Sequence, residues 1–329
     1  MTRSLRRLIL LLSVVLVVLI IVAAGLAAGK DDKPTPTVPS ATQPLTQPPT
    51  QAPTQAPTQE PTQPPTQAPT QEPTVPPTQA PTQPPVQSDM IGSLYTWDQL
   101  EAMDKTQLYY SAGSDRDDRG RPTLLLQMNQ KYSKYNTVFV APDDGNIYLT
   151  FTCGYEHLGR TGAILDILKE KNVQAVFFVN MHFTKSNPDL IRRILDEGHI
   201  LANHCSGHPD LPKENIDTIV KEIMDMHDYV LQHYGYKMKL FRPPSGYFSE
   251  QVLAIAQSLG YKTVQFSFSY VDWDRDAPVD APPALNKLIG SAHSGAIYYL
   301  HTISATNVAV LPEVIDTLRT QGYNFGLYE

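Results

Sequence analysis

Apolar runs of strand length alternate with amphipathic stretches of helix length from residue 146 to the C-terminus. Short apolar runs bounded by turn residues predict buried strands, and the stretches between them carry apolar residues at helical spacing, as at Ile216, Ile219 and Ile223. The predicted strands are residues 147–151, 173–179, 200–203, 240–242, 263–268, 296–300 and 324–328. This repeated βα alternation predicts a parallel sheet or barrel covered by helices.

The ends of three helices can be located from capping residues. Asn187 followed by proline, and Ser249, are typical of helix starts. Glycines at 198, 235 and 260 are typical of helix ends. We therefore expect one helix that ends at Gly198, a long one that ends at Gly235, and one between Ser249 and Gly260.

The chain before residue 146 has a different organisation. Residues 8–28 form an almost uninterrupted apolar run after three arginines, and a bilayer core needs about 20 residues of helix. This predicts a membrane anchor in residues 1–30, a single pass that leaves the remainder outside the cytoplasm. A cleaved signal peptide, and hence a secreted protein, is the alternative, because small residues at Ala27 and Ala28 resemble a cleavage site.

Two further segments separate that run from the βα region. Residues 31–87 repeat Pro-Thr-Gln units, which favour polyproline II and offer too little apolar surface to form a core, so they predict a disordered linker. Residues 88–145 are less regular and are expected to form a preface that packs on a domain of residues 146–329. No chemistry is inferred from the preface.

Charge limits the choice of partner. The formal net charge is -7, so no broad basic field is available for a nucleic-acid backbone. Nucleic acid is therefore not an expected partner, whereas a neutral or cationic polymer is easier to accommodate.

Chemically useful side chains cluster at the ends of the predicted strands. They are Thr152 and Cys153 after the first strand, His204 after the third, Arg242 at the end of the fourth, Asp272 beyond the fifth and His301 after the sixth. In a parallel β/α barrel the loops after the carboxyl ends of the strands build the active site. The concentration of polar residues there predicts a site.

Two histidines in this set have a spacing suited to a metal ion. His204 and His208 form a His-x-x-x-His pair, which on a helical turn brings both imidazoles to one face, where they can hold a divalent ion. His301 follows an apolar strand, where a histidine needs a partner to offset the cost of burial. It is a candidate general acid.

Five short motifs in a fixed order carry a family resemblance. They are residues 148–151 with 154–156, 203–204 with 208–211, 241–244 with Gly246, 271–273, and 300–302 with Ser304 and Asn307, followed by a closing Gln-Gly-Tyr at 321–323. With these motifs the chain resembles the polysaccharide deacetylase family, also known as the NodB homology domain or carbohydrate esterase family 4. It is most similar to the delta-lactam-biosynthetic peptidoglycan de-N-acetylases.

The resemblance implies a distorted seven-stranded (β/α) barrel and metal-dependent hydrolysis of N-acetyl groups from an amino-sugar polymer. The implied polymer is a cell-wall glycan such as peptidoglycan, and the implied cofactor is a divalent metal, zinc by expectation. By position, the implied roles are metal binding for His204 and His208, general acid for His301, orientation of His301 for Asp272, tethering of the base for Arg242, and oxyanion or substrate contacts for Ser245, Gly246 and Trp273.

The chain departs from the family where the catalytic base is expected. Thr152 stands there instead of an acid, and general-base assistance is typically worth about 100- to 10,000-fold in rate. Glu156 is the nearest other acid, but the family carries the same Gly-Tyr-Glu beside its normal base. A catalytically silent glycan-binding module is therefore the alternative function.

Cys153 stands at the family's third metal-ligand position and leaves three interpretations open. A thiolate can complete a zinc site with His204 and His208. Alternatively, Cys153 can form a disulfide with Cys205, since the compartment outside the membrane can be oxidising; this needs Cα atoms within about 7 Å. The third interpretation is an inert buried thiol.

Overall fold

The computed structural model describes residues 94–329. The predicted anchor (1–30) and linker (31–87) lie outside these residues. Within the described part of the chain, no helix combines the length and apolarity needed to cross a membrane.

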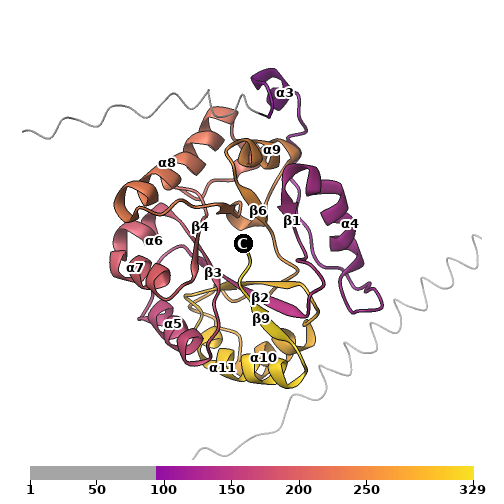
Figure 1. Ribbon diagram of the computed structural model, residues 1–329, viewed down its shortest axis with the longest axis vertical. Coiled ribbons are helices and arrows are strands. Elements are labelled where there is room, and N and C mark those ends of the chain that lie inside the picture. Colours follow the sequence, from indigo (N-terminus) through magenta and orange to yellow (C-terminus); the bar gives the residue numbers. More distant parts are fainter. Residues whose placement is uncertain (1–93) are drawn as a thin grey trace, which may run out of the picture. The chain divides into compact units, whose positions relative to one another are not determined.

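The described residues contain one sheet, whose paired neighbours all run parallel (Figure 1). Its order is β1 (Thr137–Val138), β6 (Lys262–Val264), β5 (Leu240–Phe241), β4 (Ile200–Asn203), β3 (Val176–Val179), β2 (Asn146–Cys153), β8 (Ala296–His301) and β7 (Phe268–Ser269), and β9 (Asn324–Gly326) also pairs with β2. The sheet curls into a partial barrel. The parallel α/β class was therefore predicted correctly, but the sheet has nine strands rather than seven.

The predicted strand at 263–268 is wrong as a single element. It divides into β6, which is second in the order, and β7, which is at the opposite end; three residues outside the ladder join them. The Tyr110 hydroxyl accepts from the Phe266 amide (3.0 Å) and donates to the Phe266 carbonyl (2.9 Å). Arg242 donates to the Gln265 carbonyl (3.1 Å). Side chains thus satisfy backbone groups that a continuous strand would have paired.

The sheet also begins before residue 146, inside the segment expected to be a preface. β1 pairs with β6, and the chain after it is fixed by Asn129 of helix α4 (Thr123–Tyr132). The Asn129 side chain accepts from the Phe139 amide (2.6 Å) and donates to the Val140 carbonyl (2.6 Å). β1 therefore belongs to the same sheet as the strands after residue 146.

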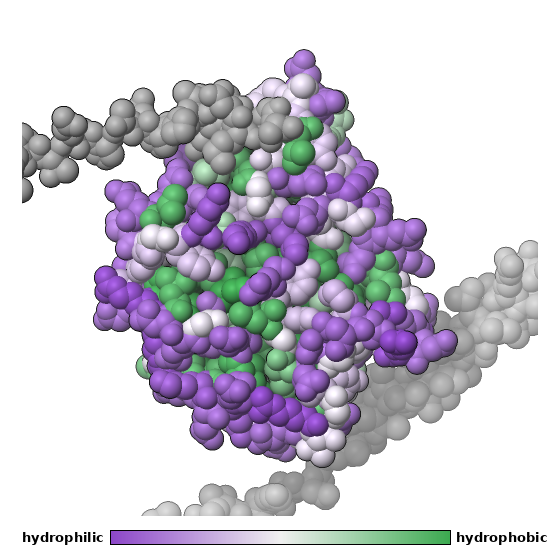
Figure 2. Space-filling view, viewed as in Figure 1, coloured by the Kyte–Doolittle hydropathy of each residue, from purple (hydrophilic) through white to green (hydrophobic). Residues whose placement is uncertain are grey.

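Helices lie outside the strands (Figure 1). Besides α4 and the short α3 (Trp97–Glu101), they are α5 (Arg160–Glu170), α6 (Met181–Ser186), α7 (Pro188–Asp196), α8 (Ile216–Tyr234), α9 (Glu250–Ser258), α10 (Ala281–Gly290) and α11 (Ala305–Thr320). The predicted ends are confirmed: the Ser249 hydroxyl accepts from the Val252 amide (3.2 Å), and Gly235 ends α8 with φ 64°. Figure 2 shows the same view as Figure 1, with hydrophilic residues around the rim of the visible face and apolar residues toward its middle.

The register of the sheet brings the reactive strand ends together. β2 lies between β3 and β8, with Thr152 opposite His301 and Cys153 opposite Val179. Val179 in turn lies opposite Asn203, the last residue of β4. Because all these strands are parallel, their carboxyl ends share one edge of the sheet.

Candidate active site

His301 and Asp272 form a hydrogen-bonded pair at the end of β8. His301 Nδ1 lies 2.7 Å from Asp272 Oδ1, and Asp272 Oδ2 accepts a hydrogen bond from the His301 backbone amide at the same distance, 2.7 Å. The Asp272 side chain is fully buried, whereas 16% of the His301 side chain is exposed. A carboxylate that accepts the Nδ1 proton leaves Nε2 as the ring nitrogen available for proton exchange.

Asn307, near the start of α11, completes this pair. Its side-chain amide donates to Asp272 Oδ2 (2.7 Å) and to the His301 carbonyl (3.0 Å). The Tyr270 hydroxyl donates to its side-chain oxygen, and Ser304 accepts from its backbone amide (3.1 Å). The motif around His301 included Asn307, but sequence reasoning gave it no role. Its contacts make it a support for the Asp272 carboxylate.

His204 and His208 also meet. Their ring centroids lie 5.1 Å apart at 72°. His204 is fully buried, and its Nδ1 must donate to the Arg242 carbonyl 2.8 Å away, so Nε2 carries the lone pair. That Nε2 is buried with no hydrogen-bond partner among the described residues. Burial lowers the pKa of His204 well below its usual range, and His208 adds to the effect.

The segment that joins these histidines is a loop, so the predicted helical turn is wrong. Cys205 and His208 adopt left-handed conformations with φ of 66° and 63°. The Asn203 side chain accepts from the Cys205 amide (2.9 Å), and the Glu222 carboxylate of α8 accepts from the Gly207 amide (2.6 Å). Groups outside the loop thus take the amide protons that a helix would bond internally.

The two cysteines are free and buried, so no disulfide joins them. β3 lies between β2, which ends at Cys153, and β4, which ends two residues before Cys205. Burial raises the pKa of the Cys153 thiol to about 12. At neutral pH this thiol is protonated.

The available side chains do not complete a three-ligand metal site. In residues 94–329 no three His, Cys, Asp or Glu side chains are arranged to hold an ion, so Cys153 is not grouped with His204 and His208. The unpartnered His204 Nε2 suits a metal ligand, and His208 lies beside it. Catalytic zinc sites, however, use three protein ligands. The pair supplies two.

Arg242 is fully buried, and its three hydrogen bonds all go to uncharged oxygens. The acceptors are the Val264 carbonyl (2.9 Å), the Thr150 hydroxyl (2.9 Å) and the Gln265 carbonyl (3.1 Å). Burial lowers the pKa of Arg242 to about 10. Thr152 lies on the same face of β2 as Thr150, and its buried hydroxyl has no hydrogen-bond partner among residues 94–329. The guanidinium expected to tether a base therefore has no acid to tether at this position.

The nearby Glu156 does not fill that position. Its Oε2 accepts from the Thr161 amide (3.3 Å), and its Oε1 is buried without a partner among the described residues. In the turn after β5, Ser245 and Gly246 have φ of 56° and 72°. The Gly246 amide donates to the Pro243 carbonyl (3.1 Å), so the turn itself uses one of the expected oxyanion donors.

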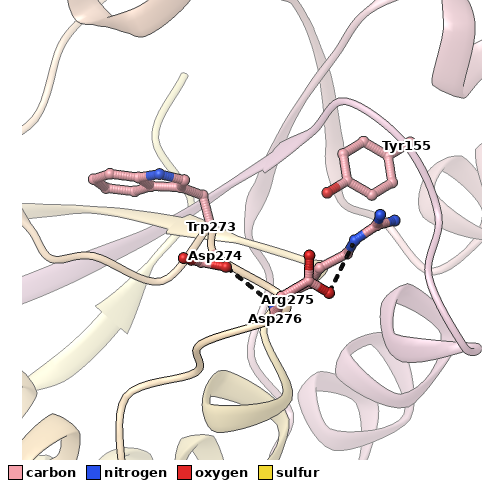
Figure 3. Close-up of a pocket in the computed structure, with 5 residues that line it drawn as sticks. All are labelled: Tyr155, Trp273, Asp274, Arg275 and Asp276. Atoms are coloured by element: carbon pink, nitrogen blue, oxygen red, sulfur yellow. Dashed lines mark hydrogen bonds and ion pairs between the residues drawn. The ribbon is translucent and has the colours of Figure 1, made fainter.

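Trp273 lies beside His301, with their ring centroids 6.1 Å apart. Its side chain is 53% exposed and lines a cavity of about 550 Å³ together with Tyr155, Asp274, Arg275 and Asp276 (Figure 3). Sequence reasoning named Trp273 as a substrate contact but assigned no role to Tyr155 or Arg275. The charged residues directly after Trp273 were the sequence feature that could have indicated this part of the cavity.

Comparisons with known proteins point to one family. Residues 140–264 match the family model described as polysaccharide deacetylase. Over 206 residues the chain is 42% identical to the peptidoglycan-N-acetylmuramic acid deacetylase PdaA of Bacillus subtilis. This match covers 62% of this chain and 78% of that protein. It is 32% identical to a peptidoglycan-N-acetylglucosamine deacetylase of Bacillus cereus, over 66% of this chain and 78% of the relative.

Solved structures give the same grouping. That of Bacillus subtilis PdaA, a family 4 carbohydrate esterase, superposes with a TM-score of 0.63 and 38% identity, covering 68% of this chain and 95% of the other. A family 4 pseudoenzyme from Bacillus anthracis, solved as a mutant with restored enzymatic activity, gives a TM-score of 0.55 at 26% identity, over 58% of this chain and 69% of that one.

Proposed function

Because the chain belongs to the polysaccharide deacetylase family, we propose that it removes N-acetyl groups from an amino-sugar polymer of the peptidoglycan class. The observation that carries the proposal is the His301, Asp272 and Asn307 arrangement. A buried carboxylate fixes one ring nitrogen of a partly exposed histidine, and an amide fixes the carboxylate. This is a complete proton-transfer unit.

His301 Nε2 is the atom that exchanges protons in the proposed reaction. When protonated, it delivers a proton to the amine that leaves as the C–N bond breaks, and Asp272 stabilises the imidazolium. When neutral, the same nitrogen can accept a proton from the attacking water. Thr152 cannot take that role, because a threonine hydroxyl is not a base at neutral pH. We therefore expect slow turnover.

His204 and His208 are the residues that would hold a divalent ion, zinc by expectation, whose chemistry is polarisation of the acetyl carbonyl. The unpartnered Nε2 of His204 supports this part of the proposal. No proton step above depends on the ion, since the third protein ligand is not in place.

The proposed location is the cell surface, with residues 1–30 as a single-pass anchor and the folded domain outside the cytoplasm; secretion after cleavage is the alternative. A cell-wall glycan is the proposed partner there. Both parts rest on the apolar run at residues 8–28 and on the glycan named in the relatives' activities.

A silent glycan-binding module is the second candidate. Thr152 favours it, because the buried Arg242 bonds to neutral oxygens where an acid is expected. The pseudoenzyme among the solved structures gives a precedent within the family for such a loss.

Acetate release from N-acetylated peptidoglycan by the full chain separates the two candidates. We expect slow release that His301→Ala reduces by on the order of 100- to 10,000-fold, because this removes the proton-transfer group. His233→Ala changes an exposed histidine of α8 and serves as the matched control. Release that is unaffected by His301→Ala would reject the proposed chemistry, and glycan binding without any release would favour the silent module.

A further inference from the structure

We propose that Tyr261 is a positioning residue for the loop that carries His204 and His208, and that it acts through Asn203 and His227. The inference rests on the proposed function, because it concerns the two histidines that would hold a divalent ion. Tyr261 and His227 lie outside the five motifs that carry the family resemblance. The basis of the proposal is a chain of buried hydrogen bonds that runs from α8 to the backbone of the loop.

The directions of these hydrogen bonds follow from the donors and acceptors present. Asn203 Oδ1 accepts from the Cys205 amide (2.9 Å), so the other polar atom of the Asn203 side chain is its NH2 nitrogen. That nitrogen donates to the Ile223 carbonyl of α8 (2.8 Å) and to the Tyr261 hydroxyl oxygen (3.0 Å). The Tyr261 hydroxyl in turn donates to His227 Nδ1, 2.6 Å away. Tyr261 thus joins a helix side chain to the last residue of β4.

The side chains that form this connection are shielded from water. Asn203 and Tyr261 are at most 1% exposed, and His227 is 8% exposed. Burial lowers the pKa of His227 and raises the pKa of Tyr261, so both groups are neutral at pH 7. A buried group that loses its partner has no water to replace it. Removal of the Tyr261 hydroxyl would therefore leave both Asn203 and His227 with an unsatisfied polar atom.

The loop needs this support because its backbone is unusual. Cys205 and His208 have φ of 66° and 63°, a left-handed region that residues with a Cβ rarely adopt. Asn203 fixes the Cys205 amide, and Glu222 of α8 accepts from the next two amides over 3.0 and 2.6 Å. The hydrogen-bond chain through Tyr261 therefore secures the start of the loop, and Glu222 secures its middle.

The backbone between the two histidines determines whether their rings stay together. The His204 ring is fixed by its bond to the Arg242 carbonyl (2.8 Å), and the His208 ring lies 5.1 Å from it, centre to centre. A ligand pair that is already in place loses less conformational freedom when it binds an ion. Residues that orient metal ligands typically contribute 10- to 100-fold to metal affinity. We therefore expect Tyr261 to affect ion binding without touching the ion.

A metal-free measurement tests the positioning itself. Tyr261→Phe removes the hydroxyl and keeps the ring that packs against Phe241. In the full chain labelled at histidine, a nuclear Overhauser contact between the rings of His204 and His208 is expected for the wild type and should weaken in Tyr261→Phe. Tyr135→Phe is the matched control, because it removes a buried hydroxyl that donates to Glu250 (2.7 Å) and should leave the contact unchanged.

Zinc affinity, measured by chelator competition on the same proteins, tests the consequence. Tyr261→Phe should weaken Zn²⁺ binding by on the order of 10-fold, whereas Tyr135→Phe should not change it. Two variants of His227 provide a rescue comparison. His227→Leu removes the acceptor of the Tyr261 proton, while His227→Asn places an amide oxygen near the position of Nδ1. The asparagine variant should therefore bind zinc more tightly than the leucine variant.

The proposal requires both effects. A ring contact or a zinc affinity that Tyr261→Phe leaves unchanged would overturn it, as would a wild type that binds no zinc. Equal losses in Tyr261→Phe and Tyr135→Phe would also overturn it, because they would indicate a general loss of stability. Both expected effects in a chain that releases no acetate would leave the role of Tyr261 in place and reject only the proposed enzymatic function.

Discussion

The two sides of the candidate site differ in how far their polar groups are satisfied. At the end of β8, Asp272 accepts three hydrogen bonds, and each of its donors is itself held in place. At the ends of β2 and β4, the Thr152 hydroxyl and His204 Nε2 are buried without partners among the described residues. Buried polar groups are normally paired, so unpaired ones indicate a missing component.

This difference separates two parts of the proposed chemistry, proton transfer on the β8 side and ion binding with base catalysis on the β2 and β4 side. The β8 side needs nothing further to exchange a proton. The β2 and β4 side has two imidazoles and a buried arginine, but neither the acid nor the third ligand that would use them. In the proposed chemistry, the proton-transfer groups at β8 are therefore in place, whereas the ion-binding and base groups at β2 and β4 are incomplete.

The largest effect is expected on the complete side, from Asp272→Asn. The amide oxygen can still accept from the His301 amide, but its NH2 group would face His301 Nδ1 and move the ring proton to Nε2. Acetate release should fall by on the order of 100- to 10,000-fold with a folded protein retained. Steady-state kinetics beside circular dichroism would check this. Activity within twofold of wild type would mean that the pair does not set the tautomer.

A smaller effect is expected when the incomplete side is given a ligand. Cys153→Asp should raise zinc affinity by at least about 10-fold, because three protein ligands replace two. Chelator competition would measure it, with Cys205→Asp as the control at the other buried cysteine. If Cys153→Ser instead lowered the zinc affinity of the wild type, the thiol would already be a ligand, and the two halves would differ less than described.

The smallest effect concerns stability. Burial lowers the pKa of His204, so below its ordinary value of 6.5 the unfolded chain binds a proton that the folded chain does not. Folding free energy is therefore lost as pH falls below about 6.5, by on the order of 1 kcal/mol for this group at pH 5.5. Urea unfolding at pH 7.5 and 5.5 should show a weaker pH dependence for His204→Asn. Equal dependence in both proteins would show that His204 is not held neutral.

Local sequence signals predicted the parts of the fold that local chemistry determines. The ends of α8 and α9 follow from Gly235 and Ser249 because a cap acts within one turn. The division of residues 263–268 could not be predicted in this way. It depends on Tyr110 and Arg242, which lie far along the chain and occupy its backbone groups.

The same distinction applies to the site. Strand-end positions located His301 and His204, since parallel strands bring their carboxyl ends together whatever the loops do. The conformation of the loop between the two metal-ligand candidates depends on Glu222, and the cavity depends on how Arg275 lies against Tyr155. Those contacts join segments that are separated in the sequence, and no local sequence pattern predicts that they meet.

The most direct test of the account is acetate release by the full chain beside Thr152→Asp and Thr152→Asn. Thr150, on the same face of β2, already contacts Arg242, so a carboxylate at 152 would enter the face where that buried guanidinium lies. The account predicts slow release by the wild type, at least about 10-fold faster release by Thr152→Asp, and no gain with Thr152→Asn, because only the carboxylate adds a base. An aspartate variant no faster than wild type would contradict it.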